Sequence, residues 1–142
     1  SGHEFALMYM SPEDGPGSYD PVFAFAERAA AASPTLVFLV VKAAYDYEDR
    51  YEEIWGQERV HRALDAMLGW LSTPTGGGGV HAVSDLSWAA YGLVSSGRGA
   101  EAVPLFARLG TDASSRPWED FGPDAIAVFD SFRRRACAAA RP

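Results

Sequence analysis

The chain has 142 residues, a formal net charge of -7, and 48% hydrophobic against 22% charged residues. This length fits one domain with its own core, and the composition is too apolar for a disordered chain. The single cysteine, Cys137, excludes a disulfide framework and a multi-cysteine metal site, no apolar run is long enough to cross a membrane, and the acidic balance argues against nucleic-acid binding.

Helix-breaking residues divide the first part of the chain into short helices. An apolar segment at 3–10 predicts the first helix, which ends before a Ser-Pro pair. A second helix is expected from about 20 to 32, because Ser18 or Asp20 can act as N-cap and a proline follows in the first turn. Its apolar face is formed by Phe23, Ala26 and Ala30.

Ser33-Pro34 repeats this cap-then-proline start, and a long helix is expected from 35 to 54. The apolar run 36–41 alone also fits a buried strand, but the residues that follow keep helical spacing. The apolar face consists of Val40, Ala44, Tyr47, Tyr51 and Ile54. The opposite, solvent-facing side consists of Lys42, Asp46, Asp49 and Glu53.

Gly56 ends this helix, and residues 57–72 form the next one. Its apolar stripe contains Val60, Leu64, Met67, Leu68 and Leu71. Four successive glycines then predict a flexible loop at 73–80, because ordering glycine carries a high entropic cost.

Three further helical segments are expected after this loop. Residues 85–96 form a helix capped by Ser84 or Asp85, and a Gly-Arg-Gly turn leads into a helix at 100–109 that tolerates Pro104 near its start. A polar loop that includes Pro117-Trp118 follows, and the last helix begins after Gly122-Pro123. Its inner stripe contains Ile126, Phe129, Phe132 and Ala136.

The prediction is therefore a single all-α domain over 1–142 with seven helices: three antiparallel pairs stacked as a solenoid and one C-terminal capping helix. Residues 86–109 resemble a tetratricopeptide (TPR) repeat. Ala90 and Ala102 take the small positions where two helices cross, Gly97 takes the turn, and Phe106 takes the aromatic position. The first helix departs from the TPR pattern at Leu86 and Leu93.

A broader likeness covers most of the chain. Gly17-Ser18, the run 23–26, Gly97-Arg98, Leu109-Gly110 and Pro117-Trp118 are similar to the C-terminal half of an actinobacterial TPR-like family of unknown function. This resemblance implies that the chain is a fragment of a longer protein, and it brings no activity with it. The excess of alanine, and of arginine over lysine, agrees with a GC-rich bacterial source.

Charge is distributed unevenly along the chain. Residues 1–65 hold twelve acids against five Lys and Arg, whereas residues 66–142 hold seven of each. Segment 45–53 is the most acidic part, with five acids, three tyrosines and one arginine. It is either a solvated helix face with the tyrosines inside or a docking surface for a basic partner. As a docking surface it predicts a binding site of Tyr45, Asp46, Glu48, Asp49, Tyr51 and Glu52, to which Trp118 is added as an aromatic residue on a loop.

Other chemistry has little support in the sequence. Glu58-x-x-His61 is one half of a carboxylate di-iron site, and the second half is missing. The glycine run is not followed by the Lys-Ser/Thr of a phosphate loop, and Cys137 follows Arg133–Arg135 without a histidine nearby in sequence. No catalytic residue, metal ligand or cofactor is therefore assigned.

Three functional hypotheses follow. The first is a non-catalytic cytoplasmic interaction module that binds a protein or peptide, with neither nucleic acid nor a membrane as partner. The second is a small-ligand protein or enzyme with a pocket formed by Tyr47, Tyr51, Glu52, Glu58 and His61. The third is a regulatory or immunity-type protein that blocks a basic target. The sequence leaves the oligomeric state open.

Overall fold

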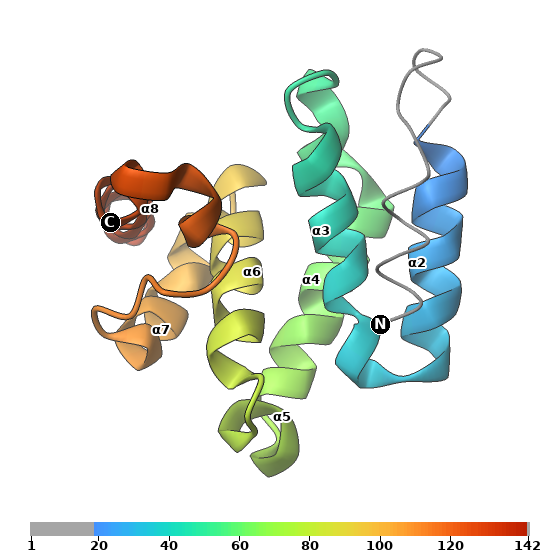
Figure 1. Cartoon of the computed structure of the whole chain (residues 1–142), viewed down its shortest axis with the longest axis horizontal. Helices are drawn as coiled ribbons and strands as arrows, with labels where there is room; N and C mark the ends of the chain where they lie inside the picture. Colours follow the sequence, from blue (N-terminus) through green and yellow to red (C-terminus); the bar gives the residue numbers. More distant parts are fainter. Residues whose placement is uncertain (1–18, 142) are drawn as a thin grey trace. The chain divides into compact units, whose positions relative to one another are not determined.

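The computed structural model describes residues 19–141, and this part of the chain is helical without any strand (Figure 1). It contains seven α-helices, labelled α2 to α8, and three short 3-10 segments, η1 to η3. The all-α prediction is confirmed. The described helices are not the same seven that the sequence predicted, because the helix expected at 3–10 lies outside the described residues. The chain divides into two compact units, with the boundary between Met67 and Leu68.

The first unit opens with two antiparallel helices, α2 (Asp20–Ala32) and α3 (Phe38–Tyr47) (Figure 1). The predicted bounds of α2 are confirmed, although its N-cap is Tyr19, which makes no side-chain cap hydrogen bond. Between the two helices, the Ser33 hydroxyl accepts a hydrogen bond from the Thr35 backbone N–H at the start of η1 (Pro34–Leu36). The cap-then-proline start is therefore confirmed, with a 3-10 turn in front of the α-helix.

The continuous helix predicted for 35–54 is wrong after Tyr47. The backbone turns at 48–51, and η2 (Glu52–Gly56) follows. The Trp55 indole Nε1 donates a 2.9 Å hydrogen bond to Glu48 Oε1. In a straight helix these residues would stand two turns, about 10.5 Å, apart along the axis. The turn brings the two groups together, and the hydrogen bond between them stabilises the break.

Helix α4 (Glu58–Leu71) has the apolar stripe that the sequence predicts, since Val60, Leu64, Met67 and Leu71 are buried and Leu68 is half-buried. Within the first unit, the Arg59 guanidinium on α4 forms ion pairs of 3.1 Å with Asp20 and 2.8 Å with Glu27, both on α2. The same guanidinium lies over the Phe23 ring, so one side chain joins α4 to the polar and the apolar surface of α2.

In the second unit, the short helix α5 (Pro74–Gly78) occupies the connection where the sequence predicted a flexible loop (Figure 1). The loop prediction is wrong because the ordering cost of glycine is offset by specific contacts. The Thr73 hydroxyl accepts a 3.0 Å hydrogen bond from the Gly76 N–H and so caps the helix, and Pro74 has a backbone suited to the first turn. Gly76 is buried, so its backbone packs where a side chain would not fit.

A helical hairpin forms the centre of the second unit, with α6 (Ala82–Ser95) and α7 (Gly99–Leu109) joined by a turn at Gly97. Gly97 has φ of 81°, a conformation that favours glycine. Ala90 and Ala102 are fully buried, as close packing of two helices requires. The predicted caps are wrong: α6 begins after His81, and both Ser84 and Asp85 lie inside it.

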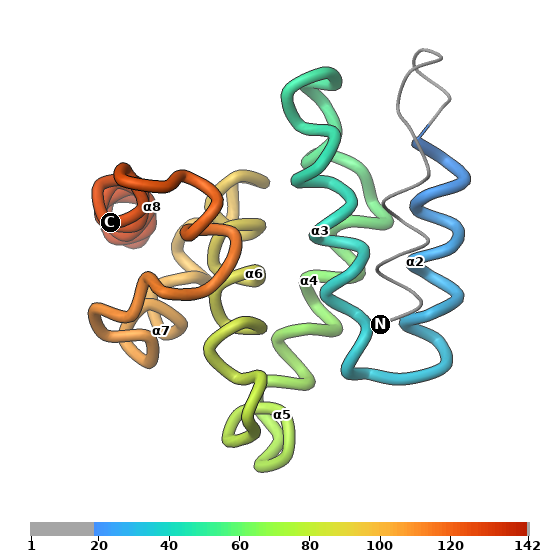
Figure 2. Tube along the Cα trace, viewed as in Figure 1, coloured from blue at the N-terminus to red at the C-terminus, as the bar shows by residue number. Residues whose placement is uncertain are grey.

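The chain then returns through a connecting segment and η3 (Trp118–Asp124) to α8 (Ala125–Ala139) (Figure 2). Phe129, Phe132 and Ala136 of α8 are buried, as predicted. Ile126 is 70% exposed, so its predicted place in the inner stripe is wrong. At 100° per residue it stands about 120° around the helix from Phe132, at the edge of the packed face.

Candidate functional site

The acidic turn, which we define as residues 46–53, connects α3 to η2 in the first unit. Its five carboxylates have different surroundings. Asp46, Asp49, Glu52 and Glu53 are exposed, whereas Glu48 is half-buried. The break after Tyr47 brings Glu48 to the Trp55 indole, and this contact distinguishes Glu48 from the four exposed carboxylates.

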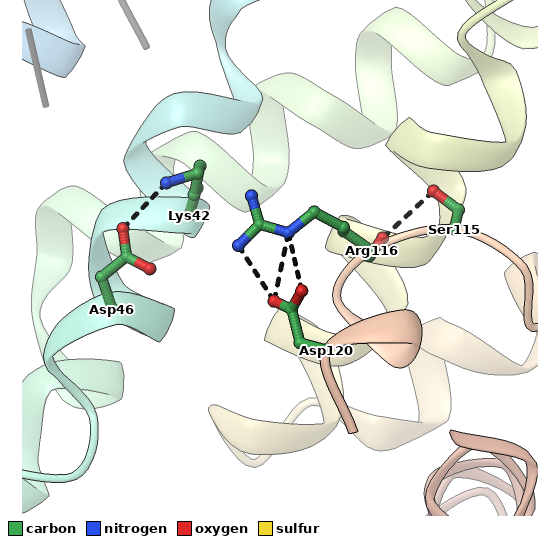
Figure 3. Close-up of polar contacts among 5 residues, drawn as sticks. All are labelled: Lys42, Asp46, Ser115, Arg116 and Asp120. Atoms are coloured by element: carbon green, nitrogen blue, oxygen red, sulfur yellow. Dashed lines mark hydrogen bonds and ion pairs between the residues drawn. The ribbon is translucent and has the colours of Figure 1, made fainter. Parts of the chain in front are cut away.

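Asp46 belongs to the structure of the first unit. Its Oδ2 lies 3.0 Å from Lys42 Nζ, one turn earlier on α3 (Figure 3). Lys42 is 7% exposed, so the prediction that it lies on the solvent face is wrong. A lysine can bury its aliphatic stem among apolar neighbours while its ammonium group reaches a carboxylate. Asp46 provides that carboxylate, and its charge is already matched within the helix.

Replacing Asp46 with alanine is expected to lower the free energy of unfolding by about 1–2 kcal/mol, because the buried Lys42 ammonium loses its charged partner. Urea denaturation followed by circular dichroism measures this. The control is Asp49→Ala in the same turn, which should change stability by less than about 0.5 kcal/mol. Equal effects of the two substitutions would contradict the structural role of Asp46.

Glu48 is also engaged, because it accepts the hydrogen bond from Trp55. Trp55 is buried, and the sequence alone did not indicate this hydrogen bond. The signal for the break was weak, since Asp49 is the poorest helix former between 48 and 53. The remaining three carboxylates, on Asp49, Glu52 and Glu53, are exposed and form no ion pair with any residue between 19 and 141.

A cluster of tyrosines supports the acidic turn from inside. The ring centroids of Tyr19 and Tyr51 are 5.0 Å apart, and Tyr47 lies 6.1 Å from each. The Tyr19 hydroxyl accepts a 2.9 Å hydrogen bond from Gln57 Nε2. Burial raises the pKa of Tyr47, and the neighbouring Asp46 carboxylate raises it further, so this hydroxyl stays protonated at neutral pH. Tyr19 was not among the predicted site residues.

The structure separates the predicted aromatic binding residues by how deeply they are buried. Tyr47 is buried, and Tyr45 and Tyr51 are half-buried. The three tyrosines therefore lie on the inner side of the segment, as expected for a solvated helix face with the tyrosines inside. Trp118 is 0% exposed in the core of the second unit, so its ring offers no surface to a partner. The ring packs instead against Phe106 on α7 and Phe129 on α8.

The residues of the alternative pocket have more ordinary surroundings. Glu58 is exposed and lies 3.2 Å from Arg62 in an i,i+4 ion pair, and His61 is half-buried on the same helix. In the part of the chain that the structure describes, no three His, Cys, Asp or Glu side chains come together in a way that could hold a metal ion.

Comparisons of the chain with protein-family models, curated proteins and solved structures give no match. None of the helices between 19 and 141 combines the length and the apolar character that crossing a membrane requires.

Proposed function

We propose that this chain is a non-catalytic interaction module that binds a basic protein or peptide through the acidic turn. The observation that carries this proposal is the uneven distribution of acidic and basic residues between the two compact units. Residues 1–67 hold twelve acids against five Lys and Arg, and residues 68–142 hold seven of each. The boundary between the two compact units thus coincides with the change in charge, and the whole net charge of -7 belongs to the first unit.

Asp49, Glu52 and Glu53 provide the recognition chemistry. Their carboxylates are exposed and unmatched by cations among the described residues, so they attract a cationic partner and raise its association rate. Tyr51 lies half-buried beside them and adds a rigid ring with a polar hydroxyl. Asp46 and Glu48 hold the turn in place and contribute to the field without being contact residues.

The proposal includes two expectations from the sequence: a TPR-like relationship and a cytoplasmic location. Support for the first comes from the α6–α7 hairpin, in which Ala90, Ala102 and Phe106 are buried and Gly97 lies in the turn between the two helices. Helical repeats commonly present peptide-binding surfaces.

The test is a variant in which Asp49→Asn, Glu52→Gln and Glu53→Gln are combined. A fluorescein-labelled nona-arginine peptide serves as the probe, with fluorescence anisotropy as the measurement at low ionic strength. We expect the variant to bind about five- to tenfold more weakly, since each exposed charge pair contributes roughly 0.3–0.5 kcal/mol. Added salt should reduce the binding of the unmodified protein toward that of the variant.

A matched control removes three exposed carboxylates from the second unit through Glu119→Gln, Asp124→Asn and Asp130→Asn. The net charge changes equally, so peptide binding should stay within about twofold of the unmodified protein if the acidic turn is the site. Equal losses in the two variants would show a response to net charge alone and would refute the proposed site. Unchanged binding in both would refute the proposal altogether.

A further inference from the structure

The second unit has no net charge, but its charges are separated along the chain. All seven of its acids lie between 68 and 130, together with three arginines, whereas residues 131–142 contain four arginines and no acid. The second half of α8 and the residues after it are therefore basic. The proposed function does not use this part of the chain.

One of these four arginines belongs to the fold of the second unit. The Arg133 guanidinium donates hydrogen bonds to the Phe106 and Gly110 carbonyls at the end of α7, and it lies 5.1 Å from the centroid of the Phe129 ring. These contacts join α8 to α7, so Arg133 is a structural residue. We call the other three arginines the basic patch: Arg134, Arg135 and Arg141.

The basic patch is exposed, and none of its three side chains forms an ion pair with a residue between 19 and 141. Arg134 stands about 140–160° around α8 from the buried Phe129 and Phe132, so it lies on the outer side of the helix. The Arg135 guanidinium lies 4.8 Å from the centroid of the Phe132 ring, and this cation–π contact keeps it at the edge of the same surface.

The structure of α8 does not account for the basic patch. A helix dipole stabilises cations within the last helical turn, and the last turn of α8 contains no basic residue. Asp130 stands one turn before Arg134 and is exposed, but the two form no ion pair. Like charges on one surface repel one another, and an acidic partner relieves that repulsion. The basic patch therefore has the character of an interaction surface.

We propose that the basic patch binds the acidic turn of a second copy of this chain. The inference rests on the proposed function and names its basic partner. Its support is charge complementarity, because the acidic turn exposes three carboxylates without a cation, on Asp49, Glu52 and Glu53, and the patch exposes three guanidinium groups without an anion. A guanidinium group can donate two parallel hydrogen bonds to one carboxylate. The two surfaces belong to different units, so the contact between copies is head-to-tail.

Sedimentation velocity of the whole chain over a range of concentrations measures this association. The acid variant carries the three substitutions in the acidic turn that are given above. The arginine variant combines Arg134→Gln, Arg135→Gln and Arg141→Gln. Each variant should associate about five- to tenfold more weakly than the unmodified chain, as expected for the loss of three exposed charge pairs. An ionic strength of about 0.1 M limits the long-range repulsion between copies that each carry a charge of -7.

A mixture of the two variants gives the sharpest result. The acid variant keeps its basic patch and the arginine variant keeps its acidic turn, so a single head-to-tail contact can form between one molecule of each. The mixture should therefore form 1:1 dimers with about the affinity of the unmodified contact. Net charge alone predicts the opposite for the acid variant, because the loss of three carboxylates reduces the repulsion between copies and should strengthen association.

A matched control compares two double variants. Arg134→Gln with Arg141→Gln should weaken association, whereas Arg28→Gln with Arg62→Gln removes two exposed arginines from the first unit and should leave it within about twofold. Equal losses in these two variants would overturn the inference. So would a mixture of the acid and arginine variants that stays monomeric.

The nona-arginine peptide separates this inference from the proposed function. The arginine variant keeps its acidic turn and should bind the peptide as the unmodified chain does. If the acid variant loses peptide binding but the unmodified chain stays monomeric at every concentration, the inference fails and the proposed function stands. Binding of a nona-glutamate peptide to such a monomer would assign the basic patch to a different acidic partner and would also overturn the inference.

Discussion

Replacing Trp118 with alanine is expected to lower the free energy of unfolding by about 3–5 kcal/mol. Its indole is 0% exposed and lies 5.2–6.0 Å, between ring centroids, from four aromatic rings. These rings belong to Tyr91, Phe106, Phe129 and Phe132, so one residue of η3 fills the space between α6, α7 and α8. Alanine would leave a large cavity, and urea denaturation followed by circular dichroism measures its cost.

Two comparisons show whether the loss comes from packing. Trp118→Phe keeps a ring and removes an indole Nε1 that has no hydrogen-bond partner in the structure, so it should cost less than half as much as alanine. Ile126→Ala removes an exposed side chain in the same unit and should change stability by less than about 0.5 kcal/mol. A loss below about 1 kcal/mol for Trp118→Ala would contradict the burial of this ring.

Gly76→Ala is expected to destabilise the second unit by about 3 kcal/mol, near the upper end of the usual cost of overpacking. The new Cβ would lie 2.1 Å from the Trp70 carbonyl oxygen, and a backbone atom cannot move aside as a flexible side chain can. Thermal or urea denaturation gives the change in stability. Hydrogen exchange of 73–79 shows whether α5 detaches from Trp70.

Gly78→Ala is the matched control in the same short helix. No atom lies within 4 Å of a Cβ built at Gly78, so alanine fits there and should stabilise the helix by up to about 1 kcal/mol. The two substitutions add the same methyl group two residues apart and are expected to act in opposite directions. Effects of the same sign and size would contradict the close approach of Gly76 to Trp70.

Local sequence signals predicted the regular helices well. The proline start of α2, the apolar stripe of α4 and the small residues Ala90 and Ala102 depend on spacing within one or two helices. The break at 48–51 and the helix α5 were missed because contacts outside the local pattern determine them. The Glu48–Trp55 hydrogen bond stabilises the first, and the second depends on Trp70 and on Arg108, which lies 31 residues beyond Gly77.

The candidate site was predicted in part. The sequence indicated where the negative charge gathers and that tyrosines line the inner side. Sequence alone gave no means to separate Asp46 and Glu48, which are engaged by Lys42 and Trp55, from Asp49 and Glu52, which stay exposed. Trp118 was misassigned as a contact residue because a tryptophan after a proline on a polar loop looks accessible in sequence, whereas η3 carries it into the core.

The burial of Lys42 has a practical consequence for labelling this protein. Lys42 is the only lysine of the chain, so it carries the only side-chain amine. Because it is 7% exposed and its ammonium lies against Asp46, an acylating reagent can reach it only when the side chain leaves this position. The rate at which this amine is acylated therefore reports how often Lys42 leaves its place beside Asp46. The basic residues of the surface are arginines, which such a reagent leaves unchanged.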